Sequence, residues 1–271
     1  MASNLLETDI EDILEDTFAE TEGELLVVDP SAETVEAIVE AGVESDDLPK
    51  LHMLADEDVL KDVMDDFLVA SKAADLVEGD SLSLRILPTD ADNALFVSED
   101  RVVALVSTDD RVAALSSDEA EFVEEVFSTY SEAFEEAEEY RLRTPAISRV
   151  RETMAEEIGE ATREDFDGVL ASMETARGNG DGLDEVTVSL LVAAKNDVLL
   201  YDISKWGEDV GIASKATFSR TKTRLEDLGL IDTEKVPIDV GRPRLRLKLG
   251  DERLKDASVD QLADVVQSAL N

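Results

Sequence analysis

Basic and hydroxyl-bearing side chains recur between Asp202 and Leu249 at spacings that suit contact with phosphate groups and base edges. One set falls on a single side of a predicted helix: Ser214, Lys215, Thr217, Ser219, Arg220, Thr223 and Arg224. A second set lies in and after a Gly-Arg-Pro-Arg turn: Arg242, Arg244 and Arg246. Clustered cations bind nucleic-acid backbones, and arginine forms paired hydrogen bonds with guanine. This pattern therefore indicates a surface for double-stranded DNA.

The distribution of charge points to the same part of the chain. Residues 183–255 hold 13 Lys+Arg against 13 Asp+Glu, whereas the other residues hold 12 against 53 and carry the whole net charge of −41. Within residues 212–248 there are 9 basic and 5 acidic side chains. Because local positive charge attracts DNA, this stretch is the expected contact region.

The order of elements around these side chains is that of a winged helix-turn-helix domain over residues 183–271. Three helices, two strands and a C-terminal helix are predicted, of which the first five span residues 184–195, 201–210, 214–228, 231–238 and 245–249. Ser214 is a favourable N-cap for the third helix, and Gly229 ends that helix. Its apolar side is expected to bury Phe218, Leu225 and Leu228. Its polar side fits the major groove, and the cationic turn between the strands fits the minor groove.

Residues 1–116 are predicted to form an α/β domain. Helical and strand-like segments alternate, as in parallel sheets with crossover helices: helix 3–20, strand 24–29, helix 30–42, strand 50–54, a long helix ending at Gly79, and strand 83–87. Two further runs, 94–98 and 101–107, are expected to pair as an antiparallel hairpin. The fold class expected for the whole chain is an α/β N-terminal domain with a helical extension, followed by a C-terminal winged helix-turn-helix (α+β) domain.

Ligands of such domains bind at the carboxyl ends of parallel strands. Side chains at those ends are Asp29 and Ser31 after the first strand, Asp56 after the second and Thr89 after the third. These residues are the candidates for binding a small-molecule effector. The alternative is that the domain binds nothing and serves as a scaffold for dimerisation.

Residues 117–177 are predicted to form a helical connector. The run SSDE at residues 116–119 matches a capping box that opens its first helix, and further helices span residues 144–159 and 163–177. The first helix has a broad apolar face: Phe122, Val126, Phe127, Tyr130 and Phe134. Because an exposed face of this size marks a contact surface, we expect a homodimer through the connector; packing against the first domain and an independent bundle are the alternatives. Residues 178–182 (GNGDG) are predicted to be a linker.

The run SKATFSRTKTRLEDLGLIDTEKVPIDVGRPRLRL, residues 214–247, resembles archaeal winged helix-turn-helix transcription factors, and the whole chain resembles haloarchaeal TrmB-like regulators. The resemblance implies a sequence-specific regulator that binds promoter DNA of central carbon metabolism genes (glycolysis and gluconeogenesis) in a halophilic archaeon. It places recognition at Ser214, Lys215, Thr217, Arg220 and Arg224, and wing contacts at Arg242 and Arg244. Lys222 departs from the family pattern, because that position is often apolar, and its stem is expected to lie along the edge of the core. The alternative function is that of a sensor or interaction protein whose winged helix docks other proteins.

TrmB-type sensor domains are related to the phospholipase D fold, whose phosphoryl chemistry needs paired His-x-Lys motifs. His52 is the only histidine of the chain and is followed by Met53 and Leu54, so these motifs are missing from the sequence. No glycine-rich phosphate loop is present, and adjacent acidic residues carry little information in a chain with 66 acids. We therefore expect no enzyme activity, no catalytic residue, no cofactor and no metal site. His52 is either structural or a ligand contact.

The amino-acid composition indicates the cellular setting of the protein. The excess of acids, with 10 Lys against 15 Arg, is typical of proteins from a cytoplasm of molar salt, where counterions screen carboxylate repulsion within about 3 Å. The chain has no cysteine, which excludes disulfides, thiolate metal sites and cysteine nucleophiles. Because the sequence contains neither an apolar run of ~18 residues nor a basic leader, we expect a soluble cytoplasmic protein without membrane contact.

Overall fold

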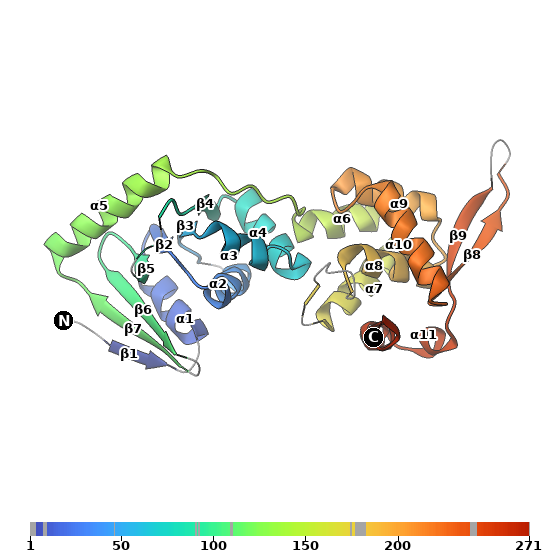
Figure 1. Cartoon of the computed structure of the whole chain (residues 1–271), viewed down its shortest axis with the longest axis horizontal. Coiled ribbons are helices and arrows are strands. Elements are labelled where there is room, and N and C mark those ends of the chain that lie inside the picture. The colour runs from blue at the N-terminus through green and yellow to red at the C-terminus, as the bar shows by residue number, and fades with distance from the viewer. Residues whose placement is uncertain are drawn as a thin grey trace. The chain divides into compact units, whose positions relative to one another are not determined.

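A computed structural model describes residues 4–7, 10–45, 47–89, 91, 93–108, 111–173, 175–176, 183–238 and 243–270. Its contacts divide the chain into an N-terminal unit, residues 1–64 and 72–142, and a C-terminal unit, residues 65–71 and 143–271. Figure 1 colours the first unit mainly blue to green and the second mainly yellow to red. Within the described residues, no helix has the length and apolar character needed to cross a membrane.

The N-terminal unit is built on a mixed sheet of seven strands in the order β1-β7-β6-β5-β2-β3-β4. The strands are β1 (Asn4–Glu7), β2 (Glu24–Val28), β3 (Lys50–Ala55), β4 (Leu82–Ile86), β5 (Ala94–Val97), β6 (Val102–Thr108) and β7 (Arg111–Ser117). β2, β3 and β4 are parallel, with Val28 beside Leu54 and Ala55 beside Ile86. β5, β6, β7 and β1 extend the sheet with antiparallel pairings. The predicted α/β domain is therefore confirmed.

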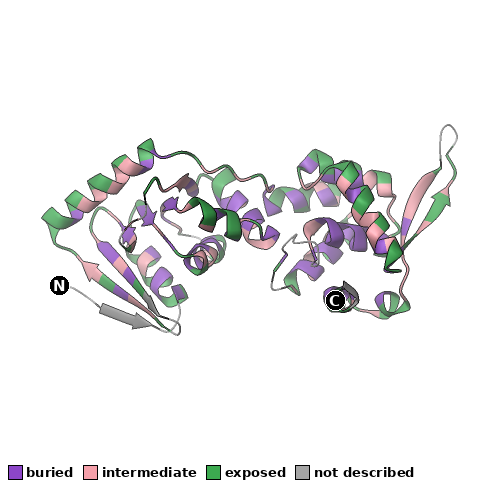
Figure 2. Ribbon diagram, in the orientation of Figure 1, coloured by how far each residue is buried: buried purple, intermediate pink, exposed green. Residues whose placement is uncertain are grey.

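Helices cover both faces of this sheet. They are α1 (Ile10–Glu20), α2 (Ala32–Glu44), α3 (Glu57–Val63), α4 (Phe67–Glu78) and α5 (Ala120–Glu136). α5 buries Val123 and Phe134 in a cluster with Leu26 of β2. The adjacent Leu25 points to the opposite face, because successive strand residues alternate, and α1 lies there. Figure 2 shows buried residues both in the strands and in the helices of this unit.

The broad apolar face of α5 is covered by its own unit. Val126, Phe127 and Tyr130 are partly buried against the sheet, whereas Phe122 is 47% exposed. Among the alternatives for this helix, the structure supports packing against the first domain. The apolar face therefore no longer gives a reason to place a dimer contact on α5.

Two predicted boundaries in this unit are wrong. The sequence predicts a helix from residue 3, but residues 4–7 form a strand that pairs with β7, and α1 begins at Ile10. β7 itself is absent from the prediction, and it extends through Ser117 into the expected capping box. Glu119 alone is the N-cap of α5, where its carboxylate accepts the N–H of Phe122 at 2.9 Å.

The long helix predicted to end at Gly79 is interrupted between α3 and α4. Asp66, which is 4% exposed, accepts the N–H of Leu68 at 2.9 Å and so caps α4. The same carboxylate accepts the N–H of Ala176 at 3.1 Å and the hydroxyl of Thr175. One buried carboxylate thus accepts backbone N–H groups from two distant parts of the chain. If the helix continued unbroken through Asp66, these N–H groups would lose this acceptor.

The C-terminal unit contains a helical core and a two-stranded sheet. Its elements are α6 (Ile147–Glu157), α7 (Glu160–Ala171), α8 (Glu185–Lys195), α9 (Leu200–Val210), α10 (Lys215–Asp227), β8 (Ile231–Val236), β9 (Arg244–Leu249), α11 (Glu252–Asp256) and α12 (Val259–Leu270). α8 lies at the centre with nearly all its residues buried, and α9 and α10 pack around it. β8 and β9 pair in antiparallel fashion. The predicted winged helix-turn-helix architecture is therefore confirmed.

α6 and α7 belong to this C-terminal core. The buried Trp206 of α9 donates its indole N–H to Thr153 Oγ1 of α6 at 3.0 Å. Asp165 of α7 accepts two hydrogen bonds of 2.8 Å from Lys195 Nζ at the end of α8. Both contacts join helices predicted in the connector to helices predicted in the winged helix domain.

The structure therefore divides the chain differently from the sequence prediction. The boundary between units falls at residues 142–143, inside the predicted connector 117–177. α7 also begins at Glu160 and ends at Ala171, earlier than the predicted helix 163–177. The predicted linker 178–182 lies outside the described residues.

Candidate nucleic-acid interface

The turn between α9 and α10 sets the position of the cationic helix. α9 ends at Gly211, whose φ of 98° is a backbone conformation that favours glycine. The N–H of Ile212 then donates to the carbonyl of Gly207 at 2.8 Å. Ser214 caps α10 as predicted, since its Oγ accepts the N–H of Thr217 at 3.2 Å.

The apolar side of α10 is anchored in the core. Phe218 and Leu225 are fully buried, in agreement with the prediction. The prediction for Leu228 is wrong, because this side chain is 44% exposed. The chain turns at Gly229, which has a φ of 72°, and Leu230 enters the core in place of Leu228.

The opposite side of α10 presents its polar residues to solvent. All seven predicted residues are accessible there: exposed Ser214, Lys215, Ser219, Arg220 and Thr223, and half-buried Thr217 and Arg224. The guanidinium of Arg220 donates to Thr217 Oγ1 at 3.2 Å, which orients it along the helix. Lys215 Nζ lies 2.5 Å from Glu208 Oε2 of α9. That hydrogen bond raises the pKa of Lys215 and lowers the pKa of Glu208.

Arg220 and Arg224 differ from their neighbours in having no acidic partner within the described part of the chain. Among the residues that the structure describes, neither arginine forms an ion pair with a carboxylate. On α9, by contrast, Lys205 lies 2.5 Å from Asp209. Two guanidinium groups on α10 are therefore available to an external anion.

The described arginines of the wing are held by acidic residues. Arg244 Nη1 lies 3.2 Å from Asp202 Oδ1, and its guanidinium stacks on Tyr201, 4.1 Å from the ring centroid. Arg246 Nη1 lies 3.7 Å from Glu234 Oε2. An approaching phosphate would have to compete with these carboxylates, so Arg244 and Arg246 are weaker anion sites than Arg220 and Arg224.

Two other predicted positions have different outcomes. Arg242 lies outside the described residues. Lys222 has a side chain that is 12% exposed, with Nζ 2.6 Å from Glu226 Oε2. Thr233 Oγ1 also donates to Glu226, at 2.8 Å. The prediction that Lys222 lies along the edge of the core is confirmed.

A hollow of about 140 Å³ lies beside the turn of the helix-turn-helix. Its lining is Phe67, Arg143, Thr144, Pro145, Glu185, Gly211 and Ile212. Burial, together with the nearby carboxylates of Asp184, Asp65 and Asp66, raises the pKa of Glu185 to about 7. Sequence reasoning missed this group, because Glu185 reads as an ordinary acid in the first turn of α8.

Replacing Glu185 by glutamine is expected to remove a pH dependence of stability. Because the folded protein binds this proton more tightly than the unfolded chain, the free energy of unfolding of the wild type falls as pH rises from 4.5 to about 7. The loss amounts to about 1–3 kcal/mol. Glutamine has no proton to lose, so the melting temperature of the variant relative to wild type should rise from about pH 5 to about pH 8. Thermal unfolding at constant KCl measures this difference; Glu156→Gln, at an exposed position of α6, is the control, and equal trends in both variants would contradict the prediction.

The residues predicted to bind an effector lie at one edge of the N-terminal sheet, but three of them serve the backbone. Ser31 and Asp56 are the N-caps of α2 and α3. Asp29 Oδ2 accepts the N–H of Ala91 at 3.2 Å, and Thr89 is exposed. Effector binding at this edge stays a prediction.

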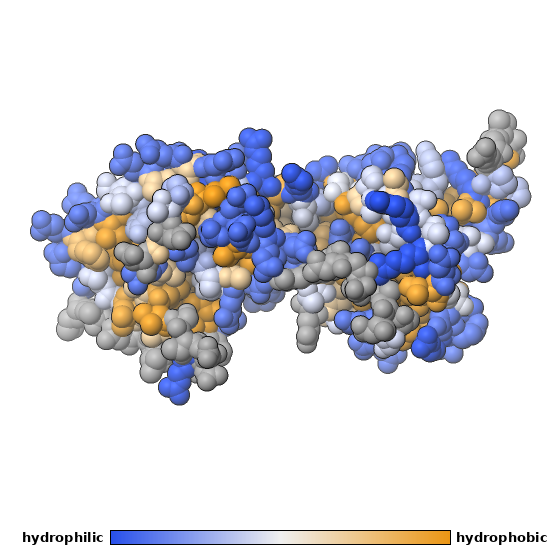
Figure 3. Space-filling model, in the orientation of Figure 1, coloured by the Kyte–Doolittle hydropathy of each residue, from blue (hydrophilic) through white to orange (hydrophobic). Residues whose placement is uncertain are grey.

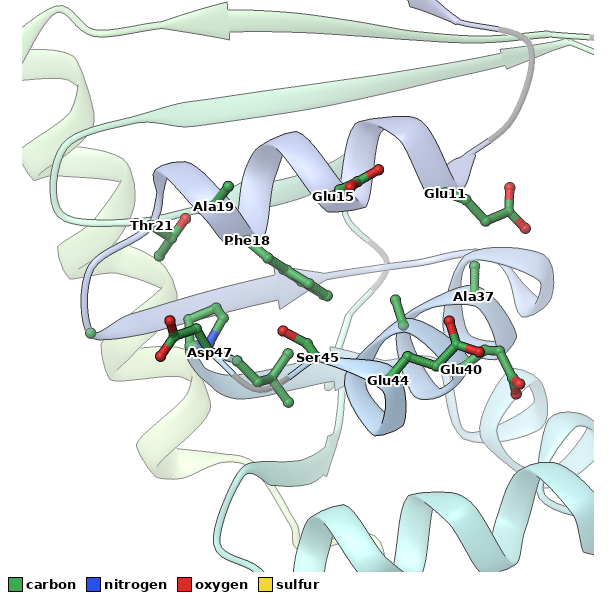
Figure 4. A pocket seen from close by; sticks show the side chains of 14 residues that line it. Glu11, Glu15, Phe18, Ala19, Thr21, Ala37, Glu40, Glu44, Ser45 and Asp47 are labelled. Atoms are coloured by element: carbon green, nitrogen blue, oxygen red, sulfur yellow. The ribbon is translucent and has the colours of Figure 1, made fainter.

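A hollow of about 1100 Å³ lies elsewhere in the N-terminal unit, between α1 and α2 (Figure 4). Carboxylates surround it: Glu11 and Glu15 from α1, Glu40 and Glu44 from α2, and Asp47 from the following loop. It adjoins the amino ends of β2 and β3, opposite to the predicted edge. Because these carboxylates repel anions, the hollow is unsuited to phosphorylated metabolites.

His52 of β3 packs against α5. Its ring meets that of Phe134 edge-on, with 4.6 Å between centroids. Its Nε2 lies 3.5 Å from Glu24 Oε1. These contacts favour the structural interpretation of His52 over a ligand contact.

Two family models match the chain. The N-terminal model of TbsP-like transcriptional regulators matches residues 2–145, and the C-terminal helix-turn-helix model of the same regulators matches residues 146–267. No curated protein matches the chain.

Solved structures give weaker likenesses. The archaeal chromatin protein TrmBL2, described with a novel mode of DNA binding, aligns with a TM-score of 0.37 and 18% identity over 51% of this chain and 54% of that chain. The chain thus spans about half the length of that structure. Nuc from Salmonella typhimurium, a phospholipase D family member, aligns with a TM-score of 0.37 and 11% identity over 52% of this chain and 99% of that chain.

The two family models meet within a few residues of the boundary between the structural units. The C-terminal family model covers α6 and α7 together with the winged helix. The hydrogen bond between Trp206 of α9 and Thr153 of α6 likewise joins α6 to that domain. The predicted resemblance to TrmB-like regulators is confirmed at the level of the family. The chain belongs to the TbsP-like family of transcriptional regulators, with a helix-turn-helix DNA-binding domain in its C-terminal unit.

Proposed function

We propose that this protein regulates specific promoters by placing α10 in the major groove of double-stranded DNA. The observation that carries the proposal is the exposed side of α10, where Arg220 and Arg224 stand among hydroxyl groups without an acidic partner in the described residues. A guanidinium that is free of an internal carboxylate can bind guanine or phosphate through two hydrogen bonds. Ser214, Lys215 and Thr217, in the cap and first turn, supply the contacts at the amino end that enters the groove.

The wing has a positioning role in this proposal. Arg244 and Arg246 must exchange their carboxylate partners for phosphates, so each gains less from DNA than an unpaired arginine does. Phosphate contacts orient a protein on the duplex without reading its sequence. Sequence discrimination is therefore assigned to α10.

The proposal includes a homodimer and a metabolic role. Operators with two-fold symmetry present half-sites ~34 Å apart, which two copies of α10 would read. The net charge of −41 supports a salt-rich archaeal cytoplasm, and Figure 3 shows hydrophilic side chains over much of the visible face of each unit. Similarity to TrmB-like regulators supports target genes in glycolysis and gluconeogenesis, with a small-molecule effector acting through the N-terminal unit.

Titration of a labelled promoter fragment against random DNA in ~1 M KCl tests sequence-specific binding. We expect the promoter to bind at least ~10³-fold more tightly than random DNA. Equal affinity for both would contradict the proposal and favour a winged helix that docks other proteins. A genome-wide map of bound sites then tests the target genes, since sites that avoid promoters of central carbon metabolism would remove that assignment.

A further inference from the structure

A cationic stretch lies outside the helix-turn-helix. Residues 141–151 (RLRTPAISRVR) contain four arginines and no acidic residue, in a chain with 66 acids among 271 residues. Residues 214–224, the proposed recognition segment, have the same charge, with four basic residues and no acidic residue. Such a stretch is unexpected in a protein whose surface is acidic, unless its positive charge has a use.

Two of these four arginines have no ion-pair partner in the part of the chain that the structure describes. Arg141 lies 3.5 Å from Glu139, and Arg151 lies 2.7 Å from Asp167. Arg143 and Arg149 are exposed, and neither forms an ion pair with any residue that the structure describes. Both belong to the C-terminal unit. They share this unpaired state with Arg220 and Arg224.

The fold brings Arg143 and Arg149 to the turn that precedes α10. Arg143 lines the same hollow as Gly211, three residues before the N-cap of α10. Arg149 lies one helical turn before Thr153, which holds Trp206 of α9. Because the segment that leads into α6 adjoins the end of α9 while Thr153 meets its middle, the two helices run antiparallel. Arg149 therefore falls beside the last turn of α9.

The acids of α9 in this region are already neutralised. Glu208 lies 2.5 Å from Lys215 Nζ, and Asp209 lies 2.5 Å from Lys205 Nζ. Glu185 lines the hollow with Arg143 but forms no ion pair with it in the structure. Because the acids of α9 already have cationic partners, Arg143 and Arg149 keep their positive charges unpaired among the described residues, although Glu185 and the nearby Asp184 partly offset them at the hollow.

We propose that Arg143 and Arg149 bind backbone phosphates of the DNA strand that borders the groove occupied by α10. This inference rests on the proposed function. When the amino end of a recognition helix enters the major groove, the turn before that helix lies close to the sugar-phosphate backbone. Arginines beside that turn are then at the level of the phosphates, which they bind through two hydrogen bonds. The DNA-binding surface accordingly includes α6 and the segment that leads into it.

The test is the salt dependence of DNA binding by Arg143→Ala/Arg149→Ala. Each lost phosphate contact lowers the slope of log Kd against log [KCl] by about 0.9, so the double variant should lose about 2 units of slope. Affinities for promoter and random DNA should fall by the same factor, about threefold at ~0.5 M KCl, and leave the specificity ratio unchanged. Arg143→Lys/Arg149→Lys keeps both charges and should retain most of the slope.

The charge-matched control is Arg253→Ala/Lys255→Ala on α11, where both cations pair with acids of their own segment. An equal loss of slope in this control would overturn the proposal, because net charge alone would then explain the effect. An unchanged slope in the Arg143→Ala/Arg149→Ala variant, with wild-type melting temperature, would overturn it as well. Failure of the proposed function is a separate result, since the wild type itself would then not prefer promoter DNA.

Discussion

Replacing Gly207 by alanine is expected to lower the melting temperature of the C-terminal unit by roughly 5–10 °C. A Cβ atom at this position of α9 would lie 2.3 Å from two ring atoms of Phe218 on α10. Phe218 is fully buried, so its ring has no space into which it can turn. Overpacking of this kind costs about 1–3 kcal/mol or more, against at most ~1 kcal/mol gained from the higher helix propensity of alanine. The cost of the steric clash exceeds the gain in helix propensity, so α9 and α10 must move apart.

Thermal unfolding of Gly207→Ala, followed by circular dichroism in molar KCl, measures this effect. Phe218→Leu provides the control, because it removes the ring atoms that the new methyl group would meet. The double variant should lose less stability than the two single variants added together, by about 1 kcal/mol or more. Strict additivity would show that Gly207 is required for some other reason than this close approach.

The helix-turn-helix could be predicted from the sequence because its determinants are local. Ser214 caps α10 by accepting the N–H of Thr217, three residues further along the chain. Asp184 caps α8 in the same way, by accepting the N–H of Thr187. Gly211 and Gly229 end helices through their own backbone conformation. Each of these residues acts within three or four positions, which is the range over which a sequence pattern is informative.

In the N-terminal sheet, by contrast, local sequence patterns fail to predict β1 and one helix break. β1 has only four residues, and its leucines continue the apolar periodicity of α1, so the sequence predicts one helix. The strand exists because it pairs with β7, more than a hundred residues away. The break before α4 has the same origin, since the hydrogen-bond partners of Asp66 at Thr175 and Ala176 are remote in the sequence. Long-range pairing of this kind leaves no local signature.

The sequence predicts which polar side chains α10 exposes, but it does not predict which of the cationic side chains are paired with carboxylates. Arg220 and Arg244 look alike in the sequence, yet among the residues that the structure describes only Arg244 has a carboxylate partner, from Asp202 forty-two positions earlier. Arg143 and Arg149 lie within the predicted connector, residues 117–177, where the sequence alone gives no reason to relate them to the helix-turn-helix. Their relation to the recognition helix depends on the packing of α6 against α9, which the bond between Trp206 and Thr153 fixes.

Replacing Arg220 by alanine is expected to weaken promoter binding by roughly 10- to 100-fold, or about 1–3 kcal/mol, and random-DNA binding only slightly. Arg220 is exposed on α10, has no carboxylate partner among the described residues, and is oriented by Thr217 Oγ1 at 3.2 Å. Such an arginine suits a base contact, whose loss affects one sequence more than others. In molar salt the release of counterions contributes little, so base contacts supply a larger share of the affinity than in a low-salt protein.

Competition titrations with promoter and random DNA, performed in parallel on three variants, decide whether Arg220 reads a base. Arg220→Ala should reduce the ratio of promoter to random affinity. Arg220→Lys should also reduce it, because lysine keeps the charge but cannot form the paired hydrogen bonds. Arg253→Ala, which removes a paired surface arginine from α11, should leave the ratio unchanged. If the ratio in Arg220→Ala equals that of the wild type, then Arg220 contacts no base, and the placement of α10 in the major groove with this face inward is wrong.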